Sequence, residues 1–572
     1  MKSYNEIIEA NSNKILKKNN NLKKKKIKFL LNFNTFQLEA YVEYYLKKKL
    51  IQAVLPKSEF DQIFQELSVI KKKDNIDILV IGNEFNLIYD INNFSIKNFA
   101  KQIFTQIELL KKLKNKFPKI EVIIFNIPEV YYQNFPNQKK QENKNIINKL
   151  NNELKVSCEA SNIYLLDYNY LITSVGQKNF YSFKNYYSSK SLLSDEGCNI
   201  IASEISKIVR SVTFPRKKCL VLDLDNTLWG GILGEEGPEG IKISNSFIGE
   251  KYLQFQKYIK SLSDNGVILG ILSKNNFSDV KKCFSQNDNL FLKLSDFSSI
   301  RINWEPKFKN INEIASELNI HKNSIVFFDD SKFERDQMKK FNPEINVIDV
   351  PFSVENYIDS IEETAFFYSN KKFITEDYKK KYQYDLVNKA KSYKLKFKDT
   401  DTMDYLKSLK MKITLSKINE KNFSRCVQML NKTNQFNFTT TRYTESTFAN
   451  YLKKNKIISL VLKLEDKFGN HGITGLITAN IQKDKCIIDN FLLSCRILGR
   501  NVEKIIIEEL IRKLKNLKVK NLIGVYKKNK KNIQCANFYK NNGFSAISKN
   551  EFLLNLQSYH LVNKKIILVK YE

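Results

Sequence analysis

Two carboxylates stand two positions apart near the middle of the chain, at the end of a short apolar run. Asp223 and Asp225 follow the apolar residues 219–222, and Thr227 comes two positions later. Two carboxylates at this spacing can share a phosphoryl transfer, because one can attack phosphorus while the other moves the proton. A divalent metal such as Mg²⁺ would screen their charge. We therefore expect a metal-assisted phosphoryl-transfer site here.

Further polar side chains follow two other apolar runs of the chain. Ser273 ends one run, Asp329 and Asp330 end another, and Lys307 lies between them just before a helical pattern. Adjacent carboxylates repel each other unless a cation lies near them, so the last pair indicates a metal. A hydroxyl, an ammonium group and an acid pair thus complete the set that phosphoryl transfer needs.

The elements that must position these groups form an alternating series. Such alternation predicts an α/β domain with a parallel sheet, whose strand C-termini meet on the one edge where ligands bind. The five polar positions would then converge on that edge. The patterns predict strands at 219–222, 266–272 and 324–328, and helices at about 250–262, 276–285, 309–318 and 333–341.

Each signal taken alone also has a structural explanation. Ser331 and Glu334 have the spacing of a capping box that opens the following helix. A single lysine such as Lys307 is most often a solvated surface residue. The complete set favours a metal-phosphate site over these separate explanations.

The order of the motifs resembles the haloacid dehalogenase superfamily of phosphatases. By that resemblance Asp223 would form an aspartyl-phosphate, and Asp225 would act as general acid and then as general base. Ser273 and Lys307 would hold the phosphoryl oxygens.

The resemblance also implies a magnesium site. Asp329 or Asp330 would bind Mg²⁺ together with the Asp223 carboxylate and the backbone carbonyl of Asp225. The connections between the motifs are only about 45 and about 35 residues long, too short for a folded cap, so we expect an open site.

A narrower resemblance is carried by residues 223–237, 303–307 and 329–335, and it continues through 432–437 and 494–500. These segments look like the FkbH-like proteins, which are haloacid-dehalogenase-type (subfamily IIIC) phosphatase/glyceryl transferases of carrier-protein-based biosynthesis. The resemblance implies an acyl carrier protein as partner and a phosphorylated substrate such as 1,3-bisphosphoglycerate. The pathway would make a polyketide-like metabolite or modify a surface glycan.

One position departs from the glyceryl-transferring members. They have a cysteine between the first two aspartates, and this chain has Leu224 there. Cys219 lies earlier on the same expected strand and should point into the sheet. We therefore expect the phosphatase step, with any acyl transfer going directly to a carrier-protein thiol.

The chain is expected to hold three domains and a linker. An N-terminal α/β domain (1–212) resembles SGNH-type hydrolases, and the haloacid dehalogenase-like domain spans 213–370. A helical linker (371–409) leads to an α+β domain (410–572).

The N-terminal domain should be noncatalytic. The three histidines of the chain are His321, His471 and His560, so nothing before residue 320 can supply the imidazole of a Ser-His-Asp arrangement. Asn83 and Asp167 are then expected to be turn and strand-end residues.

The C-terminal domain looks like a GNAT-type acyltransferase. Arg496, Gly499 and Arg500 open a helix after a strand at 487–493, and a helix N-terminus favours anions. The resemblance implies that they bind the pyrophosphate of coenzyme A or the phosphate of a carrier-protein pantetheine arm. Tyr539 would protonate the leaving thiolate or, as an equal alternative, is an aromatic packing residue.

The formal charge of +33 suggests an acidic partner. The lysines are spread along the whole chain without a nucleic-acid-binding motif, so an acyl carrier protein is favoured over nucleic acid. The run 23–26 should be a solvated edge before a strand at 27–31. Eight cysteines without paired spacing, no opening signal peptide and no membrane-length apolar run predict a cytoplasmic protein.

Two functional classes remain open from the sequence. One is an active phosphatase or acyltransferase, and the other is a noncatalytic scaffold with degenerate SGNH-like and GNAT-like domains. The intact set of Asp223, Asp225, Lys307 and the 329–330 pair favours the enzyme.

Overall fold

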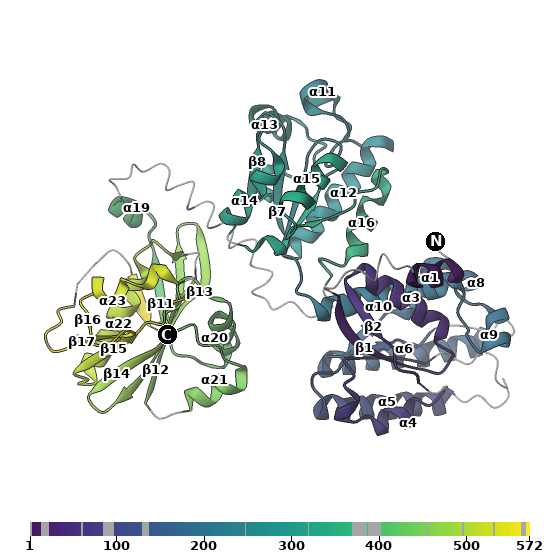
Figure 1. Cartoon of the computed structure of the whole chain (residues 1–572), viewed down its shortest axis with the longest axis horizontal. Helices are drawn as coiled ribbons and strands as arrows, with labels where there is room; N and C mark the ends of the chain where they lie inside the picture. The colour runs from purple at the N-terminus through teal and green to yellow at the C-terminus, as the bar shows by residue number, and fades with distance from the viewer. Residues whose placement is uncertain are drawn as a thin grey trace. The chain divides into compact units, whose positions relative to one another are not determined.

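The computed structural model divides the chain into two compact units, Met1–Tyr378 and Lys379–Glu572 (Figure 1). The expected linker at 371–409 lies mostly outside the described residues, and its described end includes helix α19 (Thr402–Ser408). The finer boundaries at 212, 370 and 409 stay predictions. The structure describes residues 3–12, 22–58, 61–83, 96–128, 137–245, 247–318, 320–368, 386, 390, 402–453, 456–494, 497–529, 532–561 and 568–571.

The first unit begins with a five-stranded parallel sheet of order β2-β1-β3-β4-β5. Its strands are β1 (Lys23–Leu31), β2 (Ile51–Val54), β3 (Ile78–Gly82), β4 (Glu121–Phe125) and β5 (Tyr164–Leu166). Its helices are α1 (Tyr4–Ser12), α3 (Phe36–Lys48), α4 (Ile63–Val69), α5 (Ile96–Lys116), α6 (Asn137–Ser161), α7 (Tyr168–Val175), α8 (Gln177–Phe180), α9 (Phe183–Ser189) and α10 (Asp195–Thr213).

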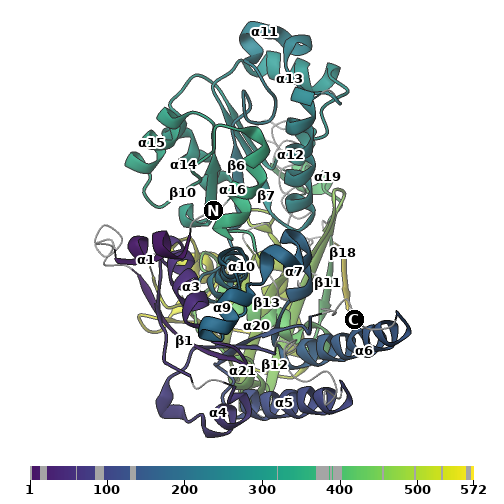
Figure 2. The same cartoon turned by 90° about the vertical axis from the view of Figure 1, so that its right-hand side faces the viewer.

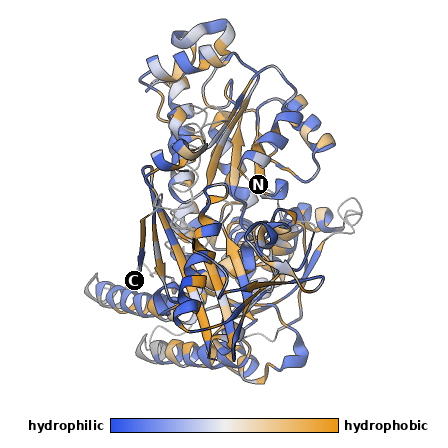
Figure 3. Ribbon diagram, turned by 90° about the vertical axis from the view of Figure 1, so that its left-hand side faces the viewer, coloured by the Kyte–Doolittle hydropathy of each residue, from blue (hydrophilic) through white to orange (hydrophobic). Residues whose placement is uncertain are grey.

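Helices cover both faces of this sheet. Alternate strand residues point to opposite sides, so each face has a hydrophobic core of its own. Phe29 of β1 packs in a core that includes residues of α3 and α10, and its neighbour Leu30 packs in a core with α4, α5 and α6. Helices α5 and α6 pack against each other (Figure 2). Figure 3 shows the resulting pattern, with hydrophobic residues concentrated in the strands.

The expected start of the first strand was wrong. Strand β1 begins at Lys23 rather than at residue 27, since Lys23 to Lys26 pair in parallel with β2. The Nζ atom of Lys25 lies 3.0 Å from Asp77 Oδ1, so the run of lysines is held by a neighbouring carboxylate as well as by the ladder.

A second five-stranded parallel sheet follows, with the order β10-β9-β6-β7-β8. Its strands are β6 (Cys219–Leu222), β7 (Ile268–Ser273), β8 (Ser299–Ile302), β9 (Ile325–Phe328) and β10 (Asn346–Val347). Its helices are α11 (Leu233–Gly240), α12 (Phe247–Asp264), α13 (Phe277–Gln286), α14 (Lys307–Glu317), α15 (Lys332–Phe341) and α16 (Tyr357–Thr364).

The expected strands and helices of this domain are confirmed to within a few residues. Residues of α12, α13 and α16 form one core with Leu220 and Leu222 of β6. On the other face, a Cβ added to Gly270 of β7 would meet Val221 of β6 and Ile314 of α14. The sheet is therefore covered on both sides, and its C-terminal edge is left for the polar groups that end the strands.

The second unit contains an eight-stranded mixed sheet of order β16-β17-β15-β14-β13-β12-β11-β18. Its strands are β11 (Lys412–Ser416), β12 (Ile457–Asp466), β13 (Gly469–Gln482), β14 (Lys485–Leu493), β15 (Asn521–Val525), β16 (Ser545–Ala546), β17 (Glu551–Asn555) and β18 (Leu568–Tyr571). Its helices include α20 (Glu420–Lys432), α21 (Glu445–Leu452), α22 (Val502–Asn516) and α23 (Phe538–Asn541).

The strand expected at 487–493 is all but the first two residues of β14, and α22 follows it as expected. Strands β14 and β15 run parallel, whereas β11 to β14 are antiparallel. In the described part of the chain, no helix is both long and hydrophobic enough to cross a membrane.

Candidate active site

The predicted phosphoryl-transfer residues meet at the C-terminal edge of the second sheet. Leu222 of β6 pairs with Phe328 of β9, so Asp223 and Asp329, the next residues of the two strands, are neighbours. The Asp223 N–H donates to the Phe328 carbonyl at 3.1 Å and extends the ladder by one bond. Ser273 is the last residue of β7, on the other side of β6.

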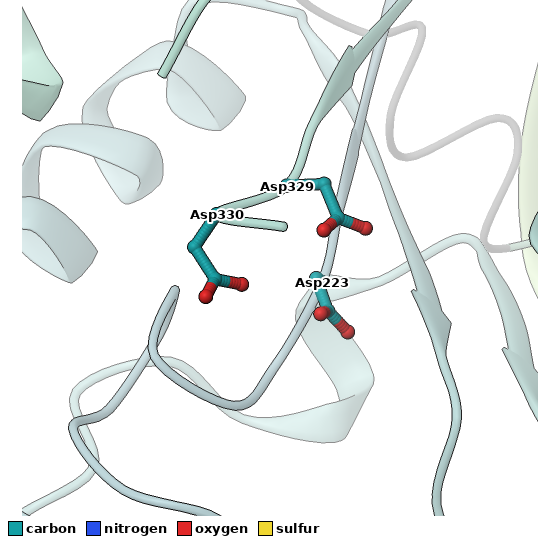
Figure 4. A group of neighbouring side chains, drawn as sticks. All are labelled: Asp223, Asp329 and Asp330. Atoms are coloured by element: carbon teal, nitrogen blue, oxygen red, sulfur yellow. The ribbon is translucent and has the colours of Figure 1, made fainter. Parts of the chain in front are cut away.

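Three carboxylates gather at this edge. One oxygen each from Asp223, Asp329 and Asp330 lies within 4.8 Å of the other two (Figure 4). Asp223 and Asp329 are buried, and the buried Oδ1 of Asp223 has no hydrogen-bond partner among the described residues. A buried carboxylate oxygen left without a donor is costly, and oxygen ligands are what Mg²⁺ prefers. The cluster therefore fits the expected magnesium site.

Lys307 joins two of these acids. Its Nζ atom lies 2.7 Å from Asp223 Oδ2 and 2.7 Å from Asp329 Oδ2. Burial disfavours the ammonium charge, but the Asp223 and Asp329 carboxylates outweigh it and raise the pKa of Lys307 above its usual value. Only 3% of Lys307 is exposed, so the alternative of a solvated surface lysine is wrong.

The remaining two acids are held in an electrostatically unfavourable state. Burial, and next the charge of Asp223, raise the pKa of Asp329 above its usual value. The same two causes raise the pKa of Asp330 to about 6. Three carboxylates facing one lysine carry an excess of negative charge, which a divalent cation would neutralise.

Backbone contacts fix the loop that carries this acid pair. One nitrogen of Arg335 donates to the carbonyls of Asp329 at 2.8 Å and of Asp330 at 2.7 Å. The Ser331 N–H donates to Asp329 Oδ1 at 3.0 Å, which turns the other oxygen of this carboxylate toward Lys307. Both acids thus have fixed positions at the end of β9.

The expected capping box is only half right. Ser331 caps α15, since its Oγ accepts from the Glu334 N–H at 3.5 Å. The Glu334 carboxylate does not return to the cap, because it accepts a 2.6 Å hydrogen bond from Lys274 Nζ. This ion pair links the residue after β7 to helix α15.

Asp225 is held apart from the three clustered carboxylates. Its Oδ1 accepts from Trp229 Nε1 at 2.9 Å and from the Leu233 N–H at 3.1 Å, and its Oδ2 accepts from Asn275 Nδ2 at 2.9 Å. Burial raises the pKa of Asp225 despite these donors. A carboxyl group with a raised pKa is suited to give a proton, which agrees with the expected acid/base role.

Two of these donors were not predicted from the sequence. Trp229 is fully buried and Asn275 nearly so, and both side chains orient Asp225. Asn275 also donates to Ser273 Oγ at 3.4 Å, so one amide positions two of the predicted residues. For Asn275, the only signal in the sequence was that a polar residue stands two positions after Ser273.

The C-terminal edge of the first sheet shows structural contacts at the two residues noted there. Asp167 caps α7 by accepting from the Tyr170 N–H at 3.2 Å. Asn83 Nδ2 donates to Gln106 Oε1 at 2.7 Å. The expectation that these are turn and strand-end residues is confirmed.

Of the four predicted coenzyme-binding residues of the second unit, the structure describes Gly499, Arg500 and Tyr539. Arg496 lies outside the described residues. Gly499 has φ +76° and open space where a Cβ would stand. Arg500 is buried and donates to Asp466 Oδ2 at 2.5 Å, and the same carboxylate oxygen lies 2.8 Å from His471 Nε2. In this conformation the Arg500 guanidinium is already paired with a carboxylate, and its expected phosphate contact stays a prediction.

Tyr539 is wholly buried, and its hydroxyl has no partner in the described part of the chain. Its ring centroid lies 4.8 Å from that of Phe438 and 5.6 Å from that of Phe552. A Cβ on Gly524 would collide with the Tyr539 ring, so this glycine makes the close approach possible. These contacts favour the packing alternative for Tyr539.

Comparison with known proteins adds one informative similarity. No protein-family model and no curated protein matches the chain. The crystal structure of the N-terminal part of BF1531 from Bacteroides fragilis, which contains a phosphatase domain complexed with Mg, matches with a TM-score of 0.55 and 25% identity. That match covers 65% of this chain and 100% of the other.

N-acetyltransferases match a shorter stretch. The ribosomal-protein-S18-alanine N-acetyltransferase from Escherichia coli aligns with 27% of this chain and 98% of its own, at 13% identity and a TM-score of 0.21. PaiA N-acetyltransferase from Thermoplasma acidophilum, in complex with coenzyme A, aligns with 25% and 96%, at 13% identity and a TM-score of 0.19. Similarity at this level supports no conclusion about the activity of the second unit.

Proposed function

We propose that the first unit is a Mg²⁺-dependent phosphatase or acyl-group transferase of the haloacid dehalogenase type, with Asp223 as its nucleophile. The observation that carries the proposal is the buried, unpartnered Oδ1 of Asp223 beside two further carboxylates and Lys307. The Mg²⁺-complexed phosphatase domain in the similar Bacteroides fragilis structure supports the metal.

The chain's own residues divide the reaction between them. Asp223 attacks phosphorus and becomes an aspartyl-phosphate as the bond to the leaving oxygen breaks. Asp225, with its raised pKa and its three donors, gives its proton to the leaving oxygen and then takes one from the water that hydrolyses the intermediate. Lys307 and the Ser273 hydroxyl stabilise the phosphoryl oxygens.

Asp329 and Asp330 would hold Mg²⁺ together with Asp223 and the Asp225 backbone carbonyl. The bound cation supplies charge neutralisation at the phosphoryl group. Thr227 supports this arrangement, since its Oγ1 donates to Asp330 Oδ1 at 3.5 Å.

An open entrance supports a large substrate or partner. Between β6 and α12, the described residues 223–245 form one short helix, α11, and no separate folded domain. In the segment that follows each strand of the sheet, one large apolar side chain is exposed. These side chains are Ile232, Phe277, Trp304, Phe333 and Phe352.

We propose that an acyl carrier protein covers these exposed apolar side chains and excludes water during the reaction. The FkbH-like motifs and the excess of basic residues, with a formal charge of +33, favour such an acidic partner. The pathway would be carrier-bound biosynthesis of a polyketide-like metabolite or of a glycan substituent. The first sheet, without a histidine of its own, would dock or shape the substrate.

We expect acyl transfer to proceed without an acyl thioester on the enzyme itself. Leu224 is buried between the two aspartates, and Cys219 is fully buried at the start of β6, where burial raises the pKa of its thiol. The carrier-protein thiolate would attack the acyl carbon of an acyl phosphate such as 1,3-bisphosphoglycerate, and the carbon–oxygen bond would break to release phosphate.

The test uses the full chain with Mg²⁺, an acyl phosphate and a holo carrier protein. We expect phosphate release and a carrier thioester, with no acyl adduct on the enzyme by intact-mass spectrometry. An adduct of one glyceryl group on an enzyme cysteine, removable by hydroxylamine, would contradict direct transfer. If neither phosphate nor thioester forms, the scaffold alternative replaces the proposed enzyme.

A further inference from the structure

Strands β14 and β15 pair over only four residues, and a distant segment occupies the edge of β14 beyond that point. The ladder ends at Ile488. The Phe438 N–H then donates to the Phe491 carbonyl at 3.0 Å, and the Leu493 N–H donates to the Phe436 carbonyl at 3.0 Å. Residues 435–440, here called the plug segment, therefore add to β14 like a short extra strand.

The plug segment also reaches the chain just after β15. The Lys527 N–H donates to the Phe438 carbonyl at 2.8 Å. Asn532 is fully buried, and its Nδ2 donates to the carbonyls of Asn437 and Lys527, both at 2.9 Å. A single asparagine thus ties the plug segment to the chain just after β15.

Aromatic rings also pack at the opening between β14 and β15. The ring of Phe438 is stacked on that of Phe491, with centroids 4.9 Å apart and planes 3° apart. It also packs against Phe538 and Tyr539, at centroid distances of 5.4 Å and 4.8 Å. Polar and apolar groups of the plug segment together fill the opening between the two strands.

This arrangement conflicts with the coenzyme expected in the second unit. The pantetheine arm of coenzyme A is an extended chain with amide groups, which binds a strand edge through backbone N–H and C=O groups. Those of Phe491 and Leu493 are already bonded to the plug segment, and Arg500 is already paired with Asp466. The residues present therefore do not fit the coenzyme in this conformation.

We propose that the plug segment is a built-in closure of the second unit, which keeps an amide-bearing acyl donor out of the opening between β14 and β15. The closed state buries the Tyr539 hydroxyl without a partner, which is a cost that favours release of the segment. Asn532 opposes that release through its hydrogen bond to the Asn437 carbonyl. The proposal is independent of the phosphatase reaction of the first unit.

The test combines hydrogen exchange and calorimetry on the full chain. In the unmodified protein, the peptide that spans the plug segment should exchange slowly, and coenzyme A at about 1 mM should give no binding heat. Asn532→Ala removes the hydrogen bond to the Asn437 carbonyl, so exchange should accelerate and the affinity for coenzyme A should rise about 10- to 30-fold into the measurable range. Asn541→Ala, at an exposed position of α23, is the matched control and should change neither.

Two results would overturn the closure. Coenzyme A binding to the unmodified protein, with the plug segment still protected, would show that the segment does not exclude the donor. Rapid exchange in Asn532→Ala without any gain in binding would show the same. Should Asn532→Ala fail to fold, Thr439→Ala takes its place, because it removes one hydrogen bond of 2.9 Å from the plug segment to the Asp489 carbonyl.

Discussion

The end of β6 and the end of β14 were both expected to bind phosphate-bearing ligands, but their polar groups differ in whether the chain itself supplies partners. At the end of β6, three carboxylates converge and one buried oxygen of Asp223 is left without a donor. At the end of β14, the backbone groups of Phe491 and Leu493 are bonded to the plug segment, and Arg500 is paired with Asp466.

The difference shows how a binding site can be told from a motif that only resembles one. Buried polar groups in a folded protein are nearly always paired, so unpaired groups that converge indicate a missing ligand. The first region has such groups, with repelling carboxylates that a cation would stabilise. In the second region the chain itself supplies the partners. Substitutions in the two regions and the addition of Mg²⁺ should distinguish a site that lacks its ligand from a region whose polar groups are already paired.

The largest effect is expected from Lys307→Met. It would leave Asp223 and Asp329 buried without their shared cation, at a cost of about 3–5 kcal/mol in the free energy of unfolding. Phosphatase turnover should be lost as well. Chemical denaturation measures the first effect, and Lys309→Met, at an exposed position two residues later, should change stability by less than about 0.5 kcal/mol. Equal stabilities of the two variants would argue against a buried ion-paired site.

Arg500→Ala should produce the next largest effect, and it tests the second region. If the guanidinium serves mainly to pair with Asp466, its removal should lower the free energy of unfolding by about 3 kcal/mol, since a buried carboxylate keeps His471 but loses its permanently charged partner. Arg512→Ala, which breaks only a 3.6 Å contact with Glu509, is the control and should have a small effect. A stable Arg500→Ala protein that loses existing coenzyme A affinity would restore the phosphate-binding role.

Mg²⁺ should stabilise the first region and leave the second unchanged. At about 100 times its dissociation constant, the ion should add about 2.7 kcal/mol to the free energy of unfolding. Thermal melts with and without Mg²⁺ measure this gain, and hydrogen exchange locates it. Asp330→Asn removes one charged ligand and should weaken the gain, whereas Asp264→Asn on α12 should not. Equal stabilisation of both units would mean that the ion acts nonspecifically.

A smaller effect is expected from Asn275→Ala, which removes one donor from Asp225 and one from Ser273. Turnover should fall about 10-fold, or roughly 1.4 kcal/mol in activation free energy, while Mg²⁺ binding stays unchanged. Steady-state kinetics and magnesium titration separate the two effects. Asn289→Ala, at an exposed position, should match the unmodified protein, and a similar loss there would contradict the positioning role of Asn275.

Much of the second sheet could be predicted because each central strand is a short apolar run that ends in polar residues. The edge strands β8 and β10 were missed, since one alternates polar with apolar residues and the other has only two residues. The convergence of Asp223, Ser273 and Asp329 followed from parallel topology alone. The contacts of Asn275 could not be predicted, because spacing does not reveal which way a side chain turns.

The pairing of Arg500 with Asp466 could not be predicted either, and the reason is physical. Asp466 lies 34 positions earlier in the chain, on another strand, so no local pattern signals the pairing. The plug segment is more distant still, because Asn437 and Asn532 are 95 positions apart. Local motifs therefore anticipated the side chains that meet in the first region. They did not reveal the pairings of the second region, because the partners come from remote parts of the chain.

The most direct test of the central claim is the phosphatase turnover of Asp223→Asn in the presence of Mg²⁺. The variant keeps Asp329 as a partner for Lys307, so it should fold, yet it removes the attacking carboxylate. We predict a loss of at least about 1000-fold in kcat, with an unchanged melting profile in the absence of metal. Turnover equal to that of the unmodified protein would show that Asp223 is not the nucleophile and would contradict the proposed function.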